Sequence, residues 1–354
     1  MSSTTAELRR LAVVNGSSDD GGGIENSGTL TITDSVLSDN RASGNGGGGV
    51  NLRGDLTLRG CELRGNSAQF GGGLFSEATL TMSDSIVSGN AASNGGGVSS
   101  SATFTATGSL ISDNTAGVSG GGIDAEGGTL TIENVELSGN TAGTSGGGLR
   151  SAGWLRMTNS TVSGNAAEDG CGGGMLVVGG TDVTNSTVSG NSASGERGCG
   201  GGMSFAGRNL LGQDLHVNHV TVADNSATWR GSAIFMDPNP IAPFYPLEIR
   251  NSIVQGNCAA TFSWTGSSRD NNVESPGDSC GFDPATNQVN VDLEDLALGP
   301  LQGNGGPTAT HALGQTSVAA DVIPAAACEV NEDQRGVARP QGAACDAGAF
   351  ERDP

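Results

Sequence analysis

A repeat of about 25 residues, a two-residue alternation of apolar and hydroxyl side chains, and a glycine-rich composition predict an all-β chain wound as a right-handed parallel β-helix. Glycine accounts for 61 of the 354 residues and aromatic residues for 4%. The glycines lack the G-X-Y period of collagen, and a hydrophobic content of 35% is too high for a disordered chain. We expect about 9 to 10 stacked coils, each with three short strands.

Two anchors define each repeat. The first is a run of small residues that ends on an apolar residue, which is Ile24, Val50, Leu74, Val98, Ile123, Leu149, Met175, Met203 and Ile234. The second is an apolar residue followed three positions later by Asn, and these are Asn40, Asn66, Asn90, Asn114, Asn140, Asn165, Asn191, Asn225 and Asn257. The first seven Asn are 26, 24, 24, 26, 25 and 26 residues apart, and Ala follows every one of the nine at the second position. This regularity predicts structurally equivalent coils.

The alternation within a repeat assigns side chains to the inside and the outside of the coil. In "TLTIT", Leu30 and Ile32 face one side of a strand and the Thr residues face the other. A single coil cannot bury its apolar side, so neighbouring coils must stack, about 4.8 Å apart, into a rod roughly 45 Å long. We expect an inward aliphatic column three positions before each Asn, formed by Leu37, Leu63, Val87, Ile111, Leu137, Val162, Val188, Val222 and Val254.

The turn residues that recur in every repeat have separate expected roles in this coil. Glycine supplies positive φ angles and lets backbones pass closely between coils. The Asn residues tolerate the left-handed conformation and are expected to hydrogen-bond to each other as a ladder. The repeats occupy residues 1–258, an irregular loop segment follows at 259–297, and residues 298–354 form a C-terminal capping segment of the same domain.

The seven cysteines predict a disulfide-pinned C-terminal half. Cys171 and Cys199 each precede a strand-starting Met by four residues, so they lie at equivalent positions one coil apart, within disulfide range. Cys258–Cys280 and Cys328–Cys345 would each close a local loop. Cys61 occupies a position that Ser fills in other coils, which predicts a buried free thiol. Because no paired CxxC occurs, we expect no metal site, and disulfides imply an oxidising compartment.

Charge excludes several classes of partner. The net charge is −21, with 16 Arg and no Lys, so nucleic acid and anionic membranes would be repelled. No run approaches 18 apolar residues, and the N-terminus lacks an apolar signal-peptide region. We expect a monomer without a membrane span, and a sequence that begins one coil into a longer secreted chain.

The repeats and the tail resemble known bacterial surface proteins. The glycine run and the apolar-x-x-Asn motif resemble the repeats of chlamydial polymorphic outer-membrane proteins. The stretches "LGPLQGNGGPTATHAL" (298–313) and "DQRGVARPQGAACDAGAFE" (333–351) closely resemble the C-terminal signature of choice-of-anchor Q, CSLREA-type β-helix proteins. This resemblance implies an extracellular or cell-surface protein of a group that mostly has no assigned activity.

One candidate site would serve a Ca²⁺-dependent uronate lyase of the pectate-lyase type. Asp124 and Glu126 share an outward face, and Arg150 lies one coil further, so two carboxylates for Ca²⁺ and a base stand together. The alternative is a solvated cross-strand ion pair. No other cofactor is expected. His216 and His219 face opposite sides and cannot share a metal, and His311 in the tail is expected to be structural.

Two further sites would serve recognition without catalysis. Outward Thr31, Thr57, Thr81, Thr105 and Thr131 form one regular column, and Thr29, Thr79, Thr103 and Thr129 form a second, an arrangement that resembles ice-binding solenoids, although Thr also simply favours solvated strands. The Pro-rich stretch 228–246 carries further aromatic candidates for a glycan or a cell-surface partner, or for capping the helix: Trp229, Phe235, Phe244 and Tyr245. We expect a non-enzymatic surface protein that acts in adhesion, structure or glycan binding.

Overall fold

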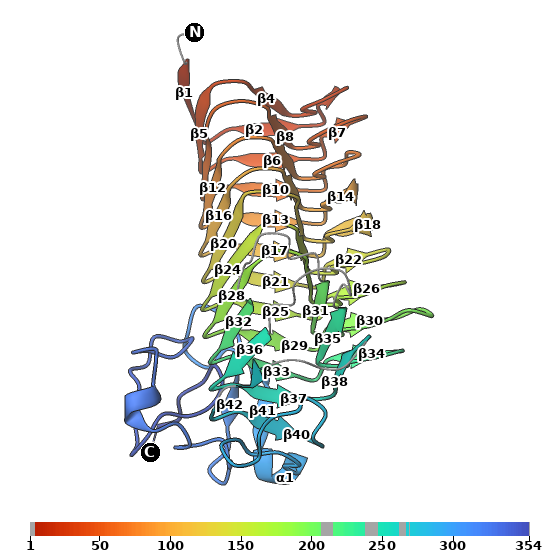
Figure 1. The fold of residues 1–354 in the computed structure, drawn as a ribbon. Coiled ribbons are helices and arrows are strands. Elements are labelled where there is room, and N and C mark those ends of the chain that lie inside the picture. Colours follow the sequence, from red (N-terminus) through yellow and green to blue (C-terminus); the bar gives the residue numbers. More distant parts are fainter. Residues whose placement is uncertain (1–3, 207–214, 238–246, 262–266, 269, 354) are drawn as a thin grey trace.

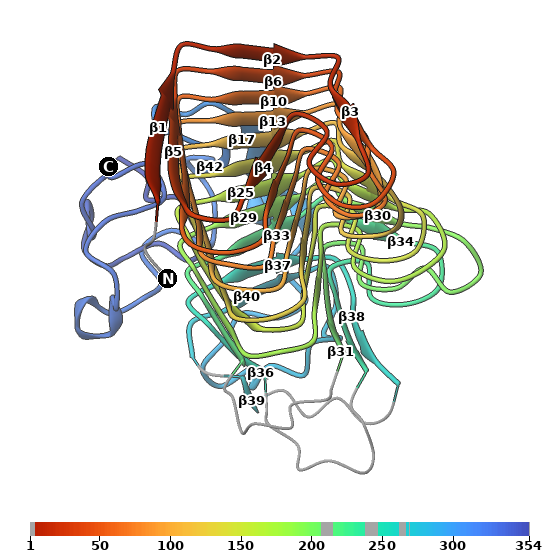
Figure 2. The ribbon, with the colours of Figure 1, turned by 90° about the horizontal axis from the view of Figure 1, so that it is seen from above.

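The computed structural model describes residues 4–206, 215–237, 247–261, 267–268 and 270–353. The chain forms a parallel β-solenoid of about ten coils, as predicted, with three main sheets that run its length (Figure 1). Seen along the axis, the three sheets form the sides of each coil (Figure 2). Pairing between consecutive coils is parallel and in register in every main sheet. Over the described residues the main sheets hold eleven, eleven and ten strands.

The strands of the three main sheets repeat once per coil. Sheet A contains β1 (Thr5–Arg9), β5 (Thr29–Thr33), β9 (Leu56–Arg59), β12 (Leu80–Ser83), β16 (Phe104–Thr107), β20 (Thr129–Glu133), β24 (Trp154–Thr158), β28 (Thr181–Thr184), β32 (Leu215–Asn218), β36 (Leu247–Arg250) and β39 (Ser267–Ser268). Sheet B contains β2 (Ala12–Val14), β6 (Val36–Ser38), β10 (Glu62–Arg64), β13 (Ile86–Ser88), β17 (Leu110–Ser112), β21 (Glu136–Ser138), β25 (Thr161–Ser163), β29 (Thr187–Ser189), β33 (Thr221–Ala223), β37 (Ile253–Gln255) and β40 (Val273–Ser275). Sheet C contains β4 (Ile24–Asn26), β8 (Gly49–Asn51), β11 (Leu74–Ser76), β15 (Val98–Ser100), β19 (Ile123–Ala125), β23 (Leu149–Ser151), β27 (Met175–Val177), β31 (Met203–Ala206), β35 (Ile234–Asp237) and β38 (Cys258–Ala260).

Shorter elements lie between sheets B and C and at the C-terminal end. The corner that follows sheet B carries a fourth small sheet of β14 (Ala91–Asn94), β18 (Thr115–Ser119), β22 (Thr141–Ala142), β26 (Ala166–Ala167), β30 (Ser192–Ala193) and β34 (Ser226–Ala227), and a pair of β3 (Ser17–Ser18) and β7 (Arg41–Ala42). The C-terminal part contains α1 (Leu293–Leu296), an antiparallel hairpin of β41 (Leu298–Gln302) and β42 (Thr310–Leu313), and a 3-10 turn at Ala325–Ala327. The described part of the chain contains no helix long and apolar enough to span a membrane.

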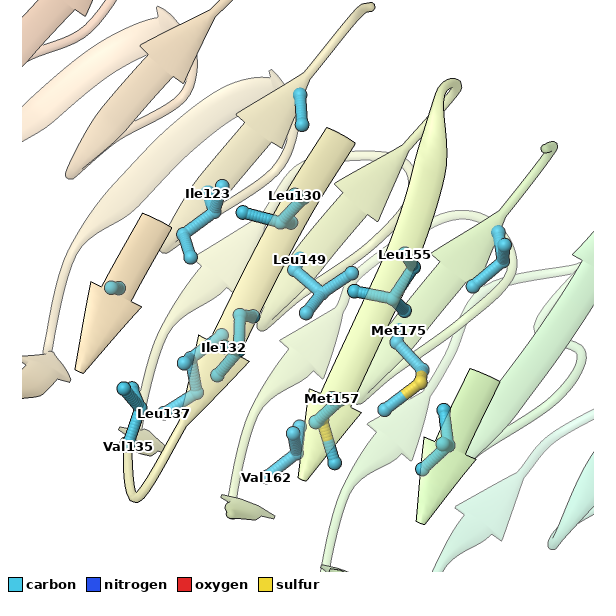
Figure 3. Packing of buried hydrophobic residues seen from close by; sticks show 14 of the residues in the cluster. Ile123, Leu130, Ile132, Val135, Leu137, Leu149, Leu155, Met157, Val162 and Met175 are labelled. Atoms are coloured by element: carbon cyan, nitrogen blue, oxygen red, sulfur yellow. The ribbon is translucent and has the colours of Figure 1, made fainter. Parts of the chain in front are cut away.

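The interior of the solenoid is filled by aliphatic columns. Leu137 and Val162 of sheet B lie in register and are fully buried, and Ile132 and Met157 of sheet A lie beside them (Figure 3). Residues that follow the glycine runs, such as Leu149, complete the packing from sheet C. Few aromatic side chains are needed because each aliphatic residue packs against its equivalents in the neighbouring coils.

The ladder Asn residues join consecutive coils. Nδ2 of Asn114 donates to Oδ1 of Asn140 at 3.0 Å and to the Val87 carbonyl at 2.9 Å, and the Asn114 backbone N–H donates to the same Oδ1. This pattern continues without interruption from Asn40 to Asn225. Eight of the nine predicted residues therefore form the ladder.

Two details of the predicted ladder were wrong. Asn257 is exposed, and its backbone N–H donates to Ser232 Oγ at 2.9 Å instead of to a ladder amide. The repeat decays there, so no equivalent Asn stacks below it. The left-handed conformation belongs to the residue before each ladder Asn, as at Asp113 (φ 55°). The ladder Asn itself stays in ordinary backbone geometry so that its amide can point into the coil.

Glycine is required where coils pass closest. A Cβ on Gly121 would lie 2.2 Å from the Gly147 carbonyl oxygen of the next coil, and Gly120 before it has φ 66°. The short distance excludes a side chain at Gly121, and the positive φ disfavours any residue other than glycine at Gly120. The glycine run is therefore a steric requirement of the stacked corner.

The C-terminal segment lies beside the solenoid and does not only close its end. Residues 298–353, drawn in blue in Figure 1, run along the outer face of sheet B in the later coils. Thr161 Oγ1 donates to the Ala309 carbonyl at 2.6 Å, and the Ala349 N–H donates to Thr221 Oγ1 at 3.0 Å. We call residues 298–353 the strap.

Three disulfides are present, between the cysteine pairs that the spacing indicates. Cys171–Cys199 joins two stacked coils with a Cα separation of 4.5 Å, and Cys258–Cys280 and Cys328–Cys345 close local loops. Cys61 is free and buried. It replaces one member of a Ser column at the corner between sheets A and B, and its Sγ lies 3.4 Å from the Arg59 carbonyl, as Ser85 Oγ lies near the Ser83 carbonyl.

Candidate functional site

The outer face of sheet A is the most regular exposed surface of the described chain. Each strand alternates, so Leu30 and Ile32 are buried inside while Thr31 between them faces outward. Register pairing places the predicted Thr column in one continuous line over five coils, which are Thr31, Thr57, Thr81, Thr105 and Thr131. These side chains are half-buried or exposed. The line is continuous because the register of the parallel sheet does not shift between these coils.

The second Thr column is incomplete. Backbone hydrogen bonds between coils align Thr29 with Asp55 and align Thr79 with Thr103, and Thr103 precedes the strand that pairs with β20. Asp55 therefore interrupts a column that is otherwise made of Thr. The two columns together give sheet A an outer face rich in hydroxyl groups in the second to sixth coils, whereas Glu7 holds the position of Thr31 in the first.

Charged residues replace Thr on the same face in the later coils. Thr131 pairs with Arg156, and the column then continues through Asp182, His216 and Glu248. His216 Nε2 lies 3.7 Å from Glu248 Oε2. The outer face of sheet A thus changes from neutral hydroxyl groups to charged groups along one rod.

An open hollow lies where these two halves meet. Trp154 and Arg156 line it together with Gly127, Gly128 and other small residues, and its volume is about 980 Å³, counting space open to solvent. The Arg156 guanidinium carbon is 5.8 Å from the centre of the Trp154 ring, within cation–π range. A Cβ on Gly153 would lie 2.2 Å from the Gly128 carbonyl oxygen, so only glycine fits there and no side chain fills the space beside the indole. Trp154 Nε1 is buried without a hydrogen-bond partner.

The structure brings the lyase candidates together as an ion pair. Arg150 Nη1 lies 2.8 Å from Asp124 Oδ1 and 3.8 Å from Glu126 Oε1. Asn94 Nδ2 and Ser119 Oγ occupy the other Asp124 oxygen at 3.3 Å and 3.2 Å. Asp124 is fully buried, because the corner that carries β14 and β18 folds over it. Both of its oxygens are committed to protein contacts, so the arrangement fits a structural pair between coils.

The three histidines lie in different surroundings. His216 faces outward from sheet A, whereas His219 is completely buried. His311 is buried as well, with Nδ1 2.7 Å from the Gly299 carbonyl and Nε2 2.8 Å from Ser189 Oγ. Those contacts attach the strap to sheet B. Among the described residues, no group of three or more His, Cys, Asp or Glu side chains is placed to hold a metal ion.

The predicted aromatic site is only partly within the described chain. Trp229 is 49% exposed, stacks with the Arg230 guanidinium at 4.5 Å, and meets the Phe235 ring at 6.0 Å. Phe244 and Tyr245 lie outside the described residues. Trp229 lies at the turn before sheet C, next to the bridge between Cys199 and Arg230, and not on the outer face of sheet A.

The hollow at Trp154 and Arg156 was not predicted from the sequence. The available signal was a Trp at an outward strand position directly after a glycine, with a Gly-Gly pair at the same place one coil earlier. His219 was also missed as a buried group, because its burial depends on the strap.

Comparison with known proteins supports the fold. The family model described as right handed beta helix region matches residues 97–275, about half of the chain. The searches of curated proteins and of solved structures found no match to this chain. The repeat, the three parallel sheets and this match together show that the chain belongs to the right-handed β-helix family.

Proposed function

We propose that this protein is a non-enzymatic, secreted or surface-displayed β-helix that binds polysaccharide through the outer face of sheet A. The observation that carries the proposal is the hollow at Trp154 and Arg156, set directly beside the outward Thr column. The proposed role is adhesion to a glycan-covered surface, with the solenoid as a rigid support.

The chemistry of this face suits a sugar polymer. An indole face stacks on the apolar face of a pyranose ring, and a guanidinium beside it donates several hydrogen bonds to hydroxyl or carboxylate oxygens. Thr hydroxyl groups both donate and accept, and they repeat along the rod about every 4.8 Å. A polymer lying along the axis would meet the aromatic platform once and the hydroxyl groups many times.

Two further observations support an extracellular location. The three disulfides favour an oxidising compartment. The tail motifs resemble those of secreted surface proteins. A net charge of −21 disfavours nucleic acid as the partner.

The lyase alternative has less support from the geometry. A Ca²⁺ site needs carboxylate oxygens that are free to coordinate, and Asp124 uses both of its oxygens for Arg150, Asn94 and Ser119. An assay for unsaturated uronate products, with and without Ca²⁺, tests this alternative directly. Ca²⁺-dependent product formation that is lost in Arg150→Ala would replace the proposal.

The proposal is tested by binding to a panel of immobilised polysaccharides. We expect Trp154→Ala to weaken binding about five- to thirtyfold, since stacking of one sugar on an indole contributes about 1–2 kcal/mol. Trp229→Ala is the matched control, because Trp229 is an accessible Trp that also stacks with an Arg, but it lies away from sheet A. Equal binding by wild type and Trp154→Ala, or loss in Trp229→Ala alone, would contradict the proposal.

Ice is the second candidate ligand, favoured by the unbroken register of the Thr column over five coils. A flat, regular array of methyl and hydroxyl groups can order water at a fixed spacing. The test is thermal hysteresis at high protein concentration. Ice binding predicts activity that Thr81→Lys abolishes and Trp154→Ala preserves, the reverse of the result expected for a glycan.

A further inference from the structure

The strap contacts β25, β29 and β33 of sheet B through polar side chains, and it contacts β37 and β40 through an apolar cluster that includes Ile253 and Val273. Gln334 is central: its Nε2 donates to Thr161 Oγ1 at 2.8 Å, and Thr187 Oγ1 donates to its Oε1 at 2.7 Å. The strap leaves Thr187 and Thr221 fully buried, whereas Ile86 at the equivalent position of an uncovered coil is 41% exposed. Polar contacts of this kind can be exchanged for contacts with water, so the part of the interface over Thr161, Thr187 and Thr221 is suited to opening.

A buried histidine lies in this interface. His219 follows β32, has φ 52°, and is 0% exposed. Neither Nδ1 nor Nε2 makes a hydrogen bond of good geometry, although the Gly348 backbone lies near enough to favour the protonated ring. The equivalent positions in the coils before and after are Asn185 (φ 53°) and Asn251 (φ 52°), so the backbone conformation does not require histidine. Burying an imidazole without well-formed hydrogen bonds lowers the stability of the fold, and Asn at this position would avoid that loss. The histidine therefore points to a role for its titration.

Cations face the ring from both sides of the interface. Arg250, at the end of β36, and Arg339, on the strap, both act on His219. Arg250 is paired with Glu329 at 2.9 Å and Arg339 with Glu351 at 3.1 Å.

The other charged groups of this part of the strap surround Arg339. Asp333, Asp346 and Arg335 act on Arg339, and His311 and Asp224 form a further titratable pair at the interface, 4.0 Å apart. The nearby carboxylates are therefore already committed to Arg250 and Arg339. A protonated ring at His219 would gain a positive charge next to two others, without an anion of its own.

Burial, together with the charge of Arg339 and a smaller effect of Arg250, lowers the pKa of His219 from 6.5 to about 2 while the strap is closed. The backbone of Gly348 favours the protonated ring but is outweighed. In an open strap the ring meets water and regains its ordinary value. Below pH 6.5 the open form therefore binds a proton that the closed form excludes.

We propose that the strap is an acid-sensitive clasp: protonation of His219 releases residues 298–353 from sheet B and uncovers Thr161, Thr187 and Thr221. The uncovered residues extend the outer column that Val36 and Ile86 begin in the first coils. The solenoid itself stays wound, because its columns and Asn ladder lie inside it. Acid thus exposes a second long face of the rod.

The size of the effect follows from the two protonation equilibria. The ratio of open to closed strap rises close to tenfold for each pH unit below about 6, and about thirtyfold between pH 8 and pH 5. Burial raises the pKa of Asp346 and of Glu351, so these carboxyl groups take up protons in the closed form and oppose opening. Their contribution is the same in wild type and in a variant of His219.

The test compares wild type with His219→Asn by hydrogen exchange of the full chain. Asn fits the left-handed position, as Asn185 and Asn251 show. Protection factors, normalised to the intrinsic exchange rate at each pH, report the opening of the strap. From pH 8 to pH 5, the protection of strap amides in wild type should fall about thirtyfold relative to the variant. Amides of β5–β20 should show no such difference. The variant His216→Asn, which changes a half-buried histidine on the outer face of sheet A, should behave as wild type.

The same pH dependence in wild type and His219→Asn would overturn the proposal. A second measurement needs no variant: NMR of the labelled His219 ring follows its protonation in wild type. Ring protonation that coincides with loss of strap protection supports the clasp. A ring that gains its proton while the strap stays protected, or equal loss of protection in the strap and in β5–β20, would overturn it.

Discussion

Asn114 shows how a single residue type holds two coils together. Its side chain donates to Val87 and Asn140, and its Oδ1 accepts from the backbone and the side chain of Asn90. All four bonds are buried. We expect Asn114→Ala to lower the free energy of unfolding by about 2–4 kcal/mol, because it leaves several buried polar groups without partners.

Asn257 is the matched control for this prediction. It occurs at the same place in the repeat but is exposed and outside the ladder. Asn257→Ala should change stability by less than about 0.5 kcal/mol in chemical denaturation. Equal losses in the two variants would show that the repeat motif matters and the ladder does not.

Cys61 gives a prediction about pH. Burial raises the pKa of its thiol above the ordinary 9.0, while the unfolded chain ionises normally. A raised pKa in the folded state means that stability is complete at low pH and is lost as pH rises above about 9. Cys61→Ser, which restores the residue found in neighbouring coils, removes this loss.

The measurement is the unfolding free energy of wild type and Cys61→Ser between pH 8 and pH 10. Wild type should lose up to about 1.4 kcal/mol more than the variant per pH unit above 9. Parallel curves would mean that the thiol ionises freely in the folded protein and is not enclosed.

At the scale of elements, the inward column of sheet B ends in a carboxyl group. Glu274 pairs in register with Val254 and takes the next place in that column. Its Oε1 accepts N–H bonds from Ser279 at 2.6 Å and Cys280 at 3.0 Å, and Oε2 is buried without a partner. These hydrogen bonds hold the segment after β40 in a turn across the open end of the solenoid.

Glu274→Gln should stabilise this end. Burial raises the pKa of Glu274, so the ionised form weakens the folded state as pH rises above the ordinary value of 4.5. The amide keeps the accepting oxygen without the charge. We expect a gain of about 1 kcal/mol at pH 8 that shrinks as pH falls towards 4.5, measured by thermal unfolding. Glu294→Gln in α1, which is exposed, should leave stability unchanged, and a loss in Glu274→Gln would contradict the assigned role.

The sequence predicted the elements of the coil well because they are local. Alternation places Leu30 inside and Thr31 outside whatever surrounds the coil, and the spacing of the Asn residues sets which coils stack. The strap could not be located in this way. Its contacts join residues far apart in sequence, such as Thr161 and Gln334, and no period relates them.

The candidate site could be predicted only in part, because only some of its residues follow the local repeat. The Thr columns follow from the repeat, and the structure places them in register. The hollow at Trp154 depends on the depth of a corner made by glycines of two coils, which periodicity does not describe. Burial of Asp124 depends on a fourth small sheet that was not expected.

At the scale of the whole molecule, a rigid rod presents two different long faces. Sheet A carries hydroxyl groups and then charges along its outer face, and sheet B is open in its first coils and covered by the strap in its later ones (Figure 1). The interior is uniform, so functional differences along the rod arise only from outward residues and corners.

The most direct test of the central claim is hydroxyl-radical footprinting of the protein with and without a mixture of soluble polysaccharides. Trp154 and Trp229 both react with such radicals, so each acts as an internal reporter for its own surface. Binding on sheet A predicts that polysaccharide slows the oxidation of Trp154 and leaves Trp229 unchanged. Slower oxidation of Trp229 alone, or no change at either residue, would contradict recognition through the outer face of sheet A.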